Sequence, residues 1–150
     1  MRLIGLTMTT SNFFTFIDDD CWVEDKWCKT AIENIQNKNG NFCYCYRYIW
    51  DSDYNKIGLD NYESIGMKNN FGYHLIDMNT IIYNKNMKDL ITAILSNYNQ
   101  YEIDRIIAEI ILTKNSGVQL KEGFLNQISP DFILDFHKKN IFFQNYINTN

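Results

Sequence analysis

Residues 41–50 place an aromatic side chain at every second position. These are Phe42, Tyr44, Tyr46, Tyr48 and Trp50, and the residues between them are Cys43, Cys45, Arg47 and Ile49. Successive side chains of a β-strand point to opposite faces, so this pattern puts all five aromatic rings on one face. The sequence therefore predicts a strand over residues 41–50, in a sheet that buries an aromatic face.

The composition is that of one globular domain. The chain has 150 residues, of which 45% are apolar and 21% charged, with a single proline and no stretch typical of a linker,. The chain contains no run of 18 apolar residues, so no transmembrane helix is expected,. The first residues also lack the long apolar segment of a secretory signal,. We therefore expect a cytosolic protein with one domain over residues 1–150.

Weaker patterns predict the other elements. β-branched and aromatic residues favour strands at 13–17, 56–67, 73–83 and 141–147,. Apolar stripes favour helices at about 21–38 and 86–98, and Ser129-Pro130-Asp131 is typical of a helix start,. Residues 105–113 fit a helix face or a buried strand, and their β-branched density favours the strand. The sum predicts an α+β fold, with a mainly antiparallel sheet and about three helices packed on it.

The charge pattern restricts the class of partner. The net charge is −4, most of the acidic excess lies in the first half, and no stripe of Lys and Arg is present. Such a chain is poorly suited to the phosphate backbone of nucleic acids and better suited to a basic protein. We expect a protein partner, with no nucleic acid and no membrane.

The common catalytic motifs are missing. There is no glycine-rich phosphate loop, no H-E-x-x-H and no G-x-S-x-G,. His74 and His137 are isolated, although a Cys–His nucleophilic pair could still form in space. We therefore predict no catalytic residues, no cofactor and no enzymatic activity, while a small enzyme of unrecognised type stays an alternative.

Four cysteines raise the question of a metal site. Cys21 and Cys28 are seven residues apart and would share a helix face, and Cys43 and Cys45 would share a strand face,. Four thiolates could hold zinc if those faces met. The C-x-x-C spacing is absent, so the preferred interpretation is buried thiols, without a metal and without disulfides.

Two acidic runs are the candidate binding surface. The denser run surrounds a tryptophan, and its spacing matches no calcium loop; a helix cap and a solvated face are the simpler interpretation of these acids. Aromatic anchors ringed by charge are also typical of interaction hot spots. The predicted partner-binding residues are Asp18, Asp19, Asp20, Trp22, Glu24, Asp25, Asp51, Asp53, Asp60 and Glu63.

A resemblance suggests what the partner is. Residues 128–136, which contain Ser129-Pro130, and the apolar stretch 141–147 resemble the ends of bacterial toxin-immunity proteins. Trp22 and Trp27 ahead of a helix and an aromatic strand are similar to immunity proteins of contact-dependent growth inhibition. The resemblance implies an acidic protein that binds and neutralises a cognate, basic, nuclease-like toxin domain by surface complementarity.

One further class stays open. Viral host-interaction proteins, such as the Bcl-2-like proteins of poxviruses, share the size and the composition rich in Asn, Ile, Tyr and Asp. That group is all-helical, so a sheet would remove it.

Overall fold

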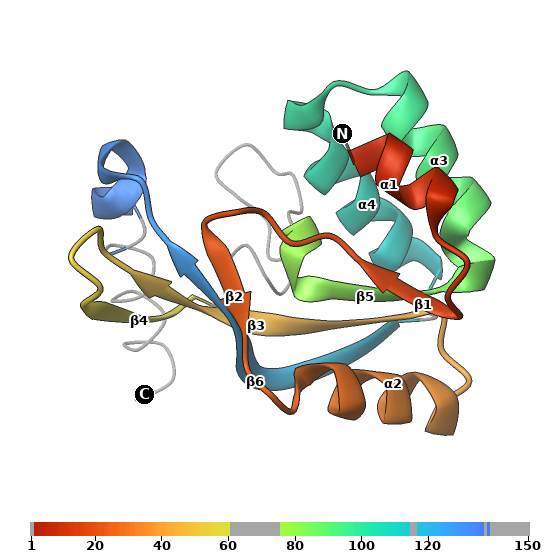
Figure 1. Cartoon of the computed structure of the whole chain (residues 1–150), viewed down its shortest axis with the longest axis horizontal. Coiled ribbons are helices and arrows are strands. Elements are labelled where there is room, and N and C mark those ends of the chain that lie inside the picture. Colours follow the sequence, from red (N-terminus) through yellow and green to blue (C-terminus); the bar gives the residue numbers. More distant parts are fainter. Residues whose placement is uncertain (1, 61–75, 115–116, 137, 139–150) are drawn as a thin grey trace.

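The computed structural model describes residues 2–60, 76–114, 117–136 and 138. These residues form one curled, six-stranded sheet with helices on both faces (Figure 1). The prediction of an α+β fold with a mainly antiparallel sheet is confirmed. The sheet removes the all-helical alternative.

The strand order explains which segments meet. The strands are β1 (Phe13–Thr15), β2 (Cys21–Val23), β3 (Phe42–Trp50), β4 (Lys56–Asp60), β5 (Ile81–Asn84) and β6 (Gly117–Ile128). They are ordered β1-β5-β3-β6-β2, and β4 pairs with the second half of β3. Among the described strands, only the central β3–β6 pair is parallel. β1 and β2 follow each other in the chain but lie at opposite ends of the strand order.

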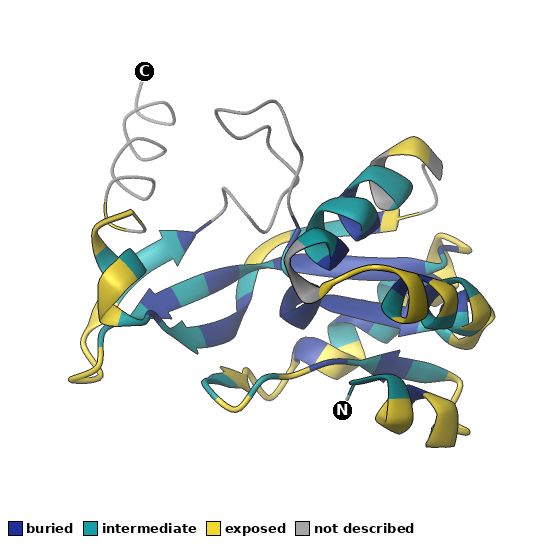
Figure 2. Cartoon of the chain, turned by 90° about the horizontal axis from the view of Figure 1, so that it is seen from above, coloured by how far each residue is buried: buried dark blue, intermediate teal, exposed yellow. Residues whose placement is uncertain are grey.

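Helices cover the two faces of the sheet unequally. They are α1 (Arg2–Met8), α2 (Trp27–Asn37), α3 (Lys88–Asn97) and α4 (Gln100–Lys114), with short 3-10 helices η1 (Met78–Thr80) and η2 (Lys85–Met87). α2 lies alone under one face, whereas α1, α3 and α4 gather above the other (Figure 1). The strands are buried in the middle of the sheet, and the outer turns of the helices are exposed (Figure 2).

Each face buries its own core. The α1-side core contains Leu6, Phe14, Phe16, Phe42, Tyr44, Ile76, Met78, Ile81, Tyr83, Met87, Ile91, Ile94, Ile103, Ile107 and Ala108. The α2-side core contains Trp27, Ala31, Ile35, Cys43, Cys45, Ile82, Val118, Phe124 and Leu125. Alternate residues of β3 and β5 therefore face opposite cores, as the pleat of a sheet requires.

The pairing of β3 with β6 is irregular in the middle of the strand. Phe42 and Tyr44 face the α1-side core, and Cys43 and Cys45 face the α2-side core. Beyond them the register shifts twice, on either side of Tyr46, and the extra residues lie on β6. Extra residues of this kind bend and twist the strand that carries them. The prediction that the aromatic rings share one face is confirmed for Phe42 and Tyr44, and for the other three rings it stays a prediction.

Other element predictions are confirmed in part. The sequence placed a strand or a helix correctly at β1, β3, β4, β5, α2, α3 and the helix at 131–136. Residues 78–80 of the strand predicted at 73–83 form the 3-10 helix η1 instead. Residues 21–23 are a strand and not the first turn of a helix, so Asp18–Asp20 cap no helix. Residues 105–113 belong to α4 and not to a strand. The sequence had indicated neither α1 nor the long β6.

Several predicted segments fall outside the described residues. They are 61–67, 73–75 and 141–147, together with His74, His137 and Glu63. None of the helices among the described residues has the length and apolar character that a membrane crossing requires. The cytosolic location stays a prediction.

Candidate functional site

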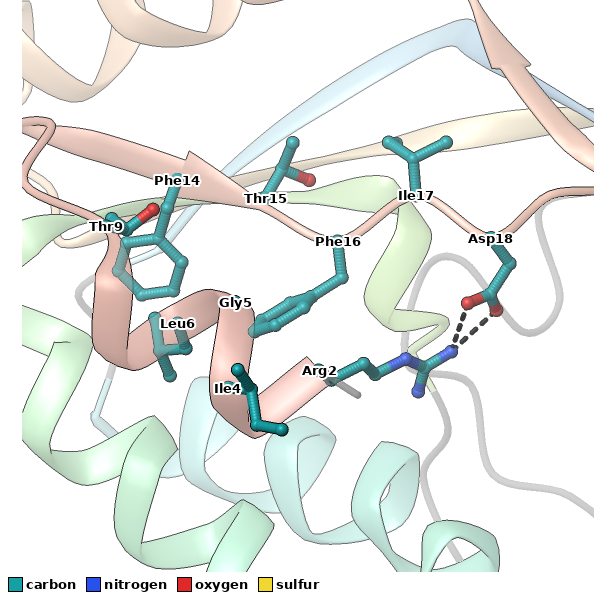
Figure 3. Close-up of a pocket in the computed structure, with 10 residues that line it drawn as sticks. All are labelled: Arg2, Ile4, Gly5, Leu6, Thr9, Phe14, Thr15, Phe16, Ile17 and Asp18. Carbon is teal, nitrogen blue, oxygen red and sulfur yellow. Dashed lines mark hydrogen bonds and ion pairs between the residues drawn. The ribbon is translucent and has the colours of Figure 1, made fainter.

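A cavity of about 570 Å³ opens between α1 and β1. Its lining is Arg2, Ile4, Gly5, Leu6, Thr9, Phe14, Thr15, Phe16, Ile17 and Asp18. Phe14 and Phe16 point toward α1 and form its apolar wall with Leu6, while Arg2 and Asp18 close one end (Figure 3). A mostly apolar cavity with a few polar groups at one end is typical of small-molecule sites.

The polar end of the cavity is an ion pair between Arg2 and Asp18, and Asn79 holds Asp18 in place. Nη2 of Arg2 lies 2.6 Å from both carboxylate oxygens of Asp18. Asn79 donates to Asp18 from its side chain at 3.0 Å and accepts from the Asp18 backbone N–H at 2.8 Å. Burial would raise the pKa of Asp18, but the hydrogen bonds from Arg2 and Asn79 and the charge of Arg2 lower it. Asp18 is therefore ionised at neutral pH.

The network continues from Asn79 into the sheet. Asp77 accepts from the backbone and side-chain N–H groups of Asn79, each at 2.8 Å. Asp77 also pairs with Arg47, whose guanidinium contacts Asp60 at 2.8 Å and Gln127 at 2.6 Å. The exposed fractions of Arg47 and Asp60 are 2% and 3%. A continuous chain of charge-assisted hydrogen bonds thus links the cavity to the interior.

Asp104 of α4 adds a carboxyl group of a different kind. Its Oδ1 accepts from the backbone N–H of Met78 at 3.3 Å. Burial and the neighbouring Asp77 raise the pKa of Asp104 to about 7, against the opposing effects of the Met78 N–H, Arg2 and Arg47. Asp104 therefore exchanges a proton in the physiological range, whereas Asp18 stays charged. Carboxyl groups with separated pKa values are characteristic of acid–base sites.

The structure divides the predicted partner-binding residues among four places. Asp18 lies in the cavity, and Asp60 is buried against Arg47 instead of open to solvent. Asp51 and Asp53 belong to the turn between β3 and β4, where Asp51 accepts from the Asn55 backbone at 2.8 Å. The others, Asp19, Asp20, Trp22, Glu24 and Asp25, follow the chain from the cavity to α2. The structure describes no side chain for Glu63.

Sequence reasoning missed the residues that complete the site. Arg2, Arg47, Asp77, Asn79 and Asp104 come from four different elements or their flanks, so no linear motif joins them. A signal was nevertheless present in three of them. Arg47 and Asp77 are single charges inside apolar or aromatic segments, and Asp104 lies between isoleucines in a segment that also carries Glu102 and Arg105. Such positions require a buried partner or a pKa shift, so each indicates a polar network.

The cysteines do not form a site in the described residues. Cys43 and Cys45 are buried, Cys28 is exposed, and all four are free. Burial raises the pKa of Cys43 and Cys45 to about 12, which leaves both thiols protonated at neutral pH. Over the described ranges, no three His, Cys, Asp or Glu side chains are arranged to hold a metal ion. The zinc alternative therefore has no support there.

Comparison with known proteins corrects the expected function. The chain matches the family model described as glycosyl transferase family 2 over residues 2–91, more than half of its length. No curated protein matched, and no family of immunity proteins was found. The prediction of an immunity protein that neutralises a toxin is therefore wrong, as is that of a protein without enzymatic character. This chain belongs to glycosyl transferase family 2.

Proposed function

We propose that this chain transfers a sugar from an activated donor to an acceptor, and that the reaction takes place in the cavity between α1 and β1. One observation carries the proposal. Every residue that lines this cavity, from Arg2 to Asp18, lies inside the segment that matches the transferase family. The cavity also ends in the densest network of ionisable groups described above.

The chemistry of sugar transfer requires opposite charges close together. When the C–O bond to the leaving group breaks, the sugar ring gains positive charge, and the leaving group takes the electron pair. Asp18, Asp77 and Asp104 are the carboxyl groups near Arg2, and their charges and the Asp18 hydrogen bond raise the pKa of Arg2 despite its burial. Fixed carboxylates suit the positive sugar ring, and a guanidinium suits a departing phosphate.

Asp104 suits the role of the base. The acceptor hydroxyl must lose its proton as it attacks, and a base works best when its pKa lies near the working pH. The pKa of Asp104 is about 7, whereas that of Asp18 is lowered. Asp104 does not line the cavity, but it is close enough to Arg2 for its charge to raise the pKa of that residue. We assign the proton to Asp104 and the electrostatic stabilisation of the sugar to Asp18.

The test is turnover of activated sugars. The purified chain is incubated with a panel of uridine and guanosine diphosphate sugars, with and without simple sugar acceptors, and release of the nucleoside diphosphate is measured. We expect Asp18→Asn to reduce turnover at least about tenfold, since it removes a charge that acts on the transition state. Asp19→Asn is the matched control, because Asp19 is exposed and does not line the cavity.

The dependence on pH tests the base separately. The wild-type rate should rise as the pH increases through about 7, where Asp104 ionises, and Asp104→Asn should lose this rise. The proposal is wrong if the wild type leaves every donor intact. It is also wrong if Asp18→Asn and Asp19→Asn behave alike.

A further inference from the structure

A second cavity, of about 480 Å³, lies beside the middle of β6 and shares no residue with the first. Its lining is Glu24, Asp25, Lys26, Tyr48, Lys56, Gly123 and Phe124. The lining thus combines two aromatic residues with four charged ones. Two carboxylates and two ammonium groups balance each other, so the cavity carries no net charge.

The strand register places more aromatic surface next to this cavity. Trp22 of β2 lies opposite Asn126 of β6, and Asn126 lies opposite Tyr48 of β3. Residues that lie opposite each other on neighbouring strands share a face of the sheet. The ring of Trp50 lies 5.5 Å from that of Trp22, and the two rings are tilted by 48°. Trp22 is 38% exposed, a high value for a side chain of its size.

Asn126 holds the surface in a fixed shape. It accepts from Nε1 of Trp50 at 2.9 Å and donates to Oε1 of Glu24 at 2.9 Å, although it is only 1% exposed. One buried amide thus fixes an indole ring and a carboxylate side by side. The ring of Tyr48 packs directly against Gly123, since a Cβ added to Gly123 would lie only 2.5 Å from that ring.

We infer that this surface, formed by Trp22, Tyr48, Trp50, Glu24 and Lys56, is a binding site for a neutral saccharide. A sugar ring presents C–H groups on its faces and hydroxyl groups around its edge. The electron-rich face of an aromatic ring attracts the C–H groups, and carboxylates accept from the hydroxyls. The balanced charge favours a neutral sugar over a nucleotide or a polyanion.

Lys56 fits the same interpretation. Its ammonium lies 3.2 Å from the centre of the Tyr48 ring and 5.7 Å from that of Trp50. Such a contact is weak at an exposed position, and the flexible side chain can move aside and donate to a hydroxyl. The inference rests on the proposed function only in expecting sugar chemistry, since the surface is separate from the cavity of Arg2 and Asp18.

Isothermal titration calorimetry of the full chain tests this site, with maltohexaose, cellohexaose and chitohexaose as probes. At least one probe should bind with Kd below about 1 mM. Trp22→Ala should weaken that binding at least about tenfold, which is the scale of loss for an aromatic anchor. Glu24→Gln should weaken it to a smaller extent, because the amide oxygen can still accept from Asn126. Tyr98→Ala is the matched control, since Tyr98 is an aromatic residue that is 48% exposed on another part of the surface.

The two proposals fail independently. Asp18→Asn should bind the saccharide as the wild type does, and Trp22→Ala should still release nucleotide from a donor when no acceptor is added. The saccharide site is absent if no probe binds at millimolar concentration, or if Trp22→Ala binds as tightly as Tyr98→Ala. Neither result would bear on donor turnover.

Discussion

Arg47 keeps its positive charge inside the sheet because acceptors surround its guanidinium. Asp60, Asp77 and Gln127 approach it from β4, from the residue before η1 and from β6. A buried charge is tolerated when it is paired and hydrogen-bonded, and loss of one partner leaves the others uncompensated. The same guanidinium thus joins three segments and fixes Asp77, the next carboxylate in the network that leads to the cavity.

Arg47→Met should destabilise the fold strongly. The methionine fills similar space but leaves Asp60 and Asp77 without their cation, which costs about 3–5 kcal/mol for a buried pair. Urea unfolding followed by tryptophan fluorescence measures the change. Lys121→Met is the control, because Lys121 is exposed on β6 and its loss should change the free energy of unfolding by less than about 0.5 kcal/mol. Equal effects of the two substitutions would show that Arg47 has no structural role.

Asp104 makes stability depend on pH in a direction opposite to that of a paired carboxylate. Its pKa is raised from 3.8 to about 7 in the folded chain, so the folded state binds the proton more readily than the unfolded state. Stability is therefore lost as the pH rises between these values. Asp104→Asn removes this loss of stability. The substitution should therefore favour the folded state more near pH 8 than near pH 5.

The expected difference between the two pH values is about 1 kcal/mol or more, because one pKa unit corresponds to about 1.4 kcal/mol and partial exposure reduces the effect. Urea unfolding at both pH values measures it. Asp135→Asn, at an exposed helix position, should show no such dependence. A parallel pH profile for the two variants would contradict the assigned pKa.

At the scale of elements, the sequence predicted what local patterns determine. The alternation in β3 and the apolar stripe of α3 give the right elements because the pattern and the packing agree,. α4 was predicted as a strand because isoleucine favours strands. Its buried residues Ile103 and Ile107 nevertheless recur at helical spacing and pack into the α1-side core, and that packing outweighs intrinsic propensity,.

The candidate site was less predictable than the fold. Asp18 was singled out as part of an acidic run, but its partners Arg2 and Asn79, and Asp104 near Arg2, are brought close only by the tertiary fold. The shifts in register on either side of Tyr46 leave no trace in the alternating pattern. Long-range pairing of this kind is set by how helices and strands pack, and one sequence does not contain that information in a local form.

Replacing two of the glycines by alanine should change the stability of the fold in opposite directions. A Cβ on Gly117 at the start of β6 would meet the buried ring of Phe42 at 1.8 Å, whereas one on Gly5 in α1 meets nothing within 4 Å. Gly117→Ala should therefore destabilise the chain by about 1–3 kcal/mol, the cost of overpacking a core. Gly5→Ala should stabilise it by up to about 1 kcal/mol, because alanine favours a helix. Thermal unfolding of both variants distinguishes them, and a stable Gly117→Ala variant would contradict the close packing of β3 on β6.

At the scale of the whole molecule, the segment that matches the family is not a separate unit. Residues 2–91 contain five of the six strands. The sixth, β6, lies between β3 and β2 and supplies Val118, Phe124 and Leu125 to the α2-side core. Without β6, β2 has no partner among the described strands, and that core is open on one side.

A fragment of residues 1–91 should therefore fail to fold. Its far-ultraviolet circular dichroism should lack a cooperative thermal transition, because the exposed core and the unpaired strands cannot offset the entropy of ordering the chain. Residues 92–150 added as a second chain should restore the transition, and the intact chain is the reference. A cooperative transition of the fragment alone would show that the family segment is self-sufficient.

The short connection between β1 and β2 has a geometric consequence for the sheet. Thr15 lies level with Cys43, and Cys21 lies level with Ile49, four strand spacings away. On a flat surface these two corners would be about 28 Å apart, from about 19 Å across the strands and about 20 Å along them. The chain between them reaches only about 20–22 Å when fully stretched. The segment around Asp18 that joins β1 to β2 is therefore too short for a flat sheet. The strands have to curl so that Thr15 and Cys21 come closer together.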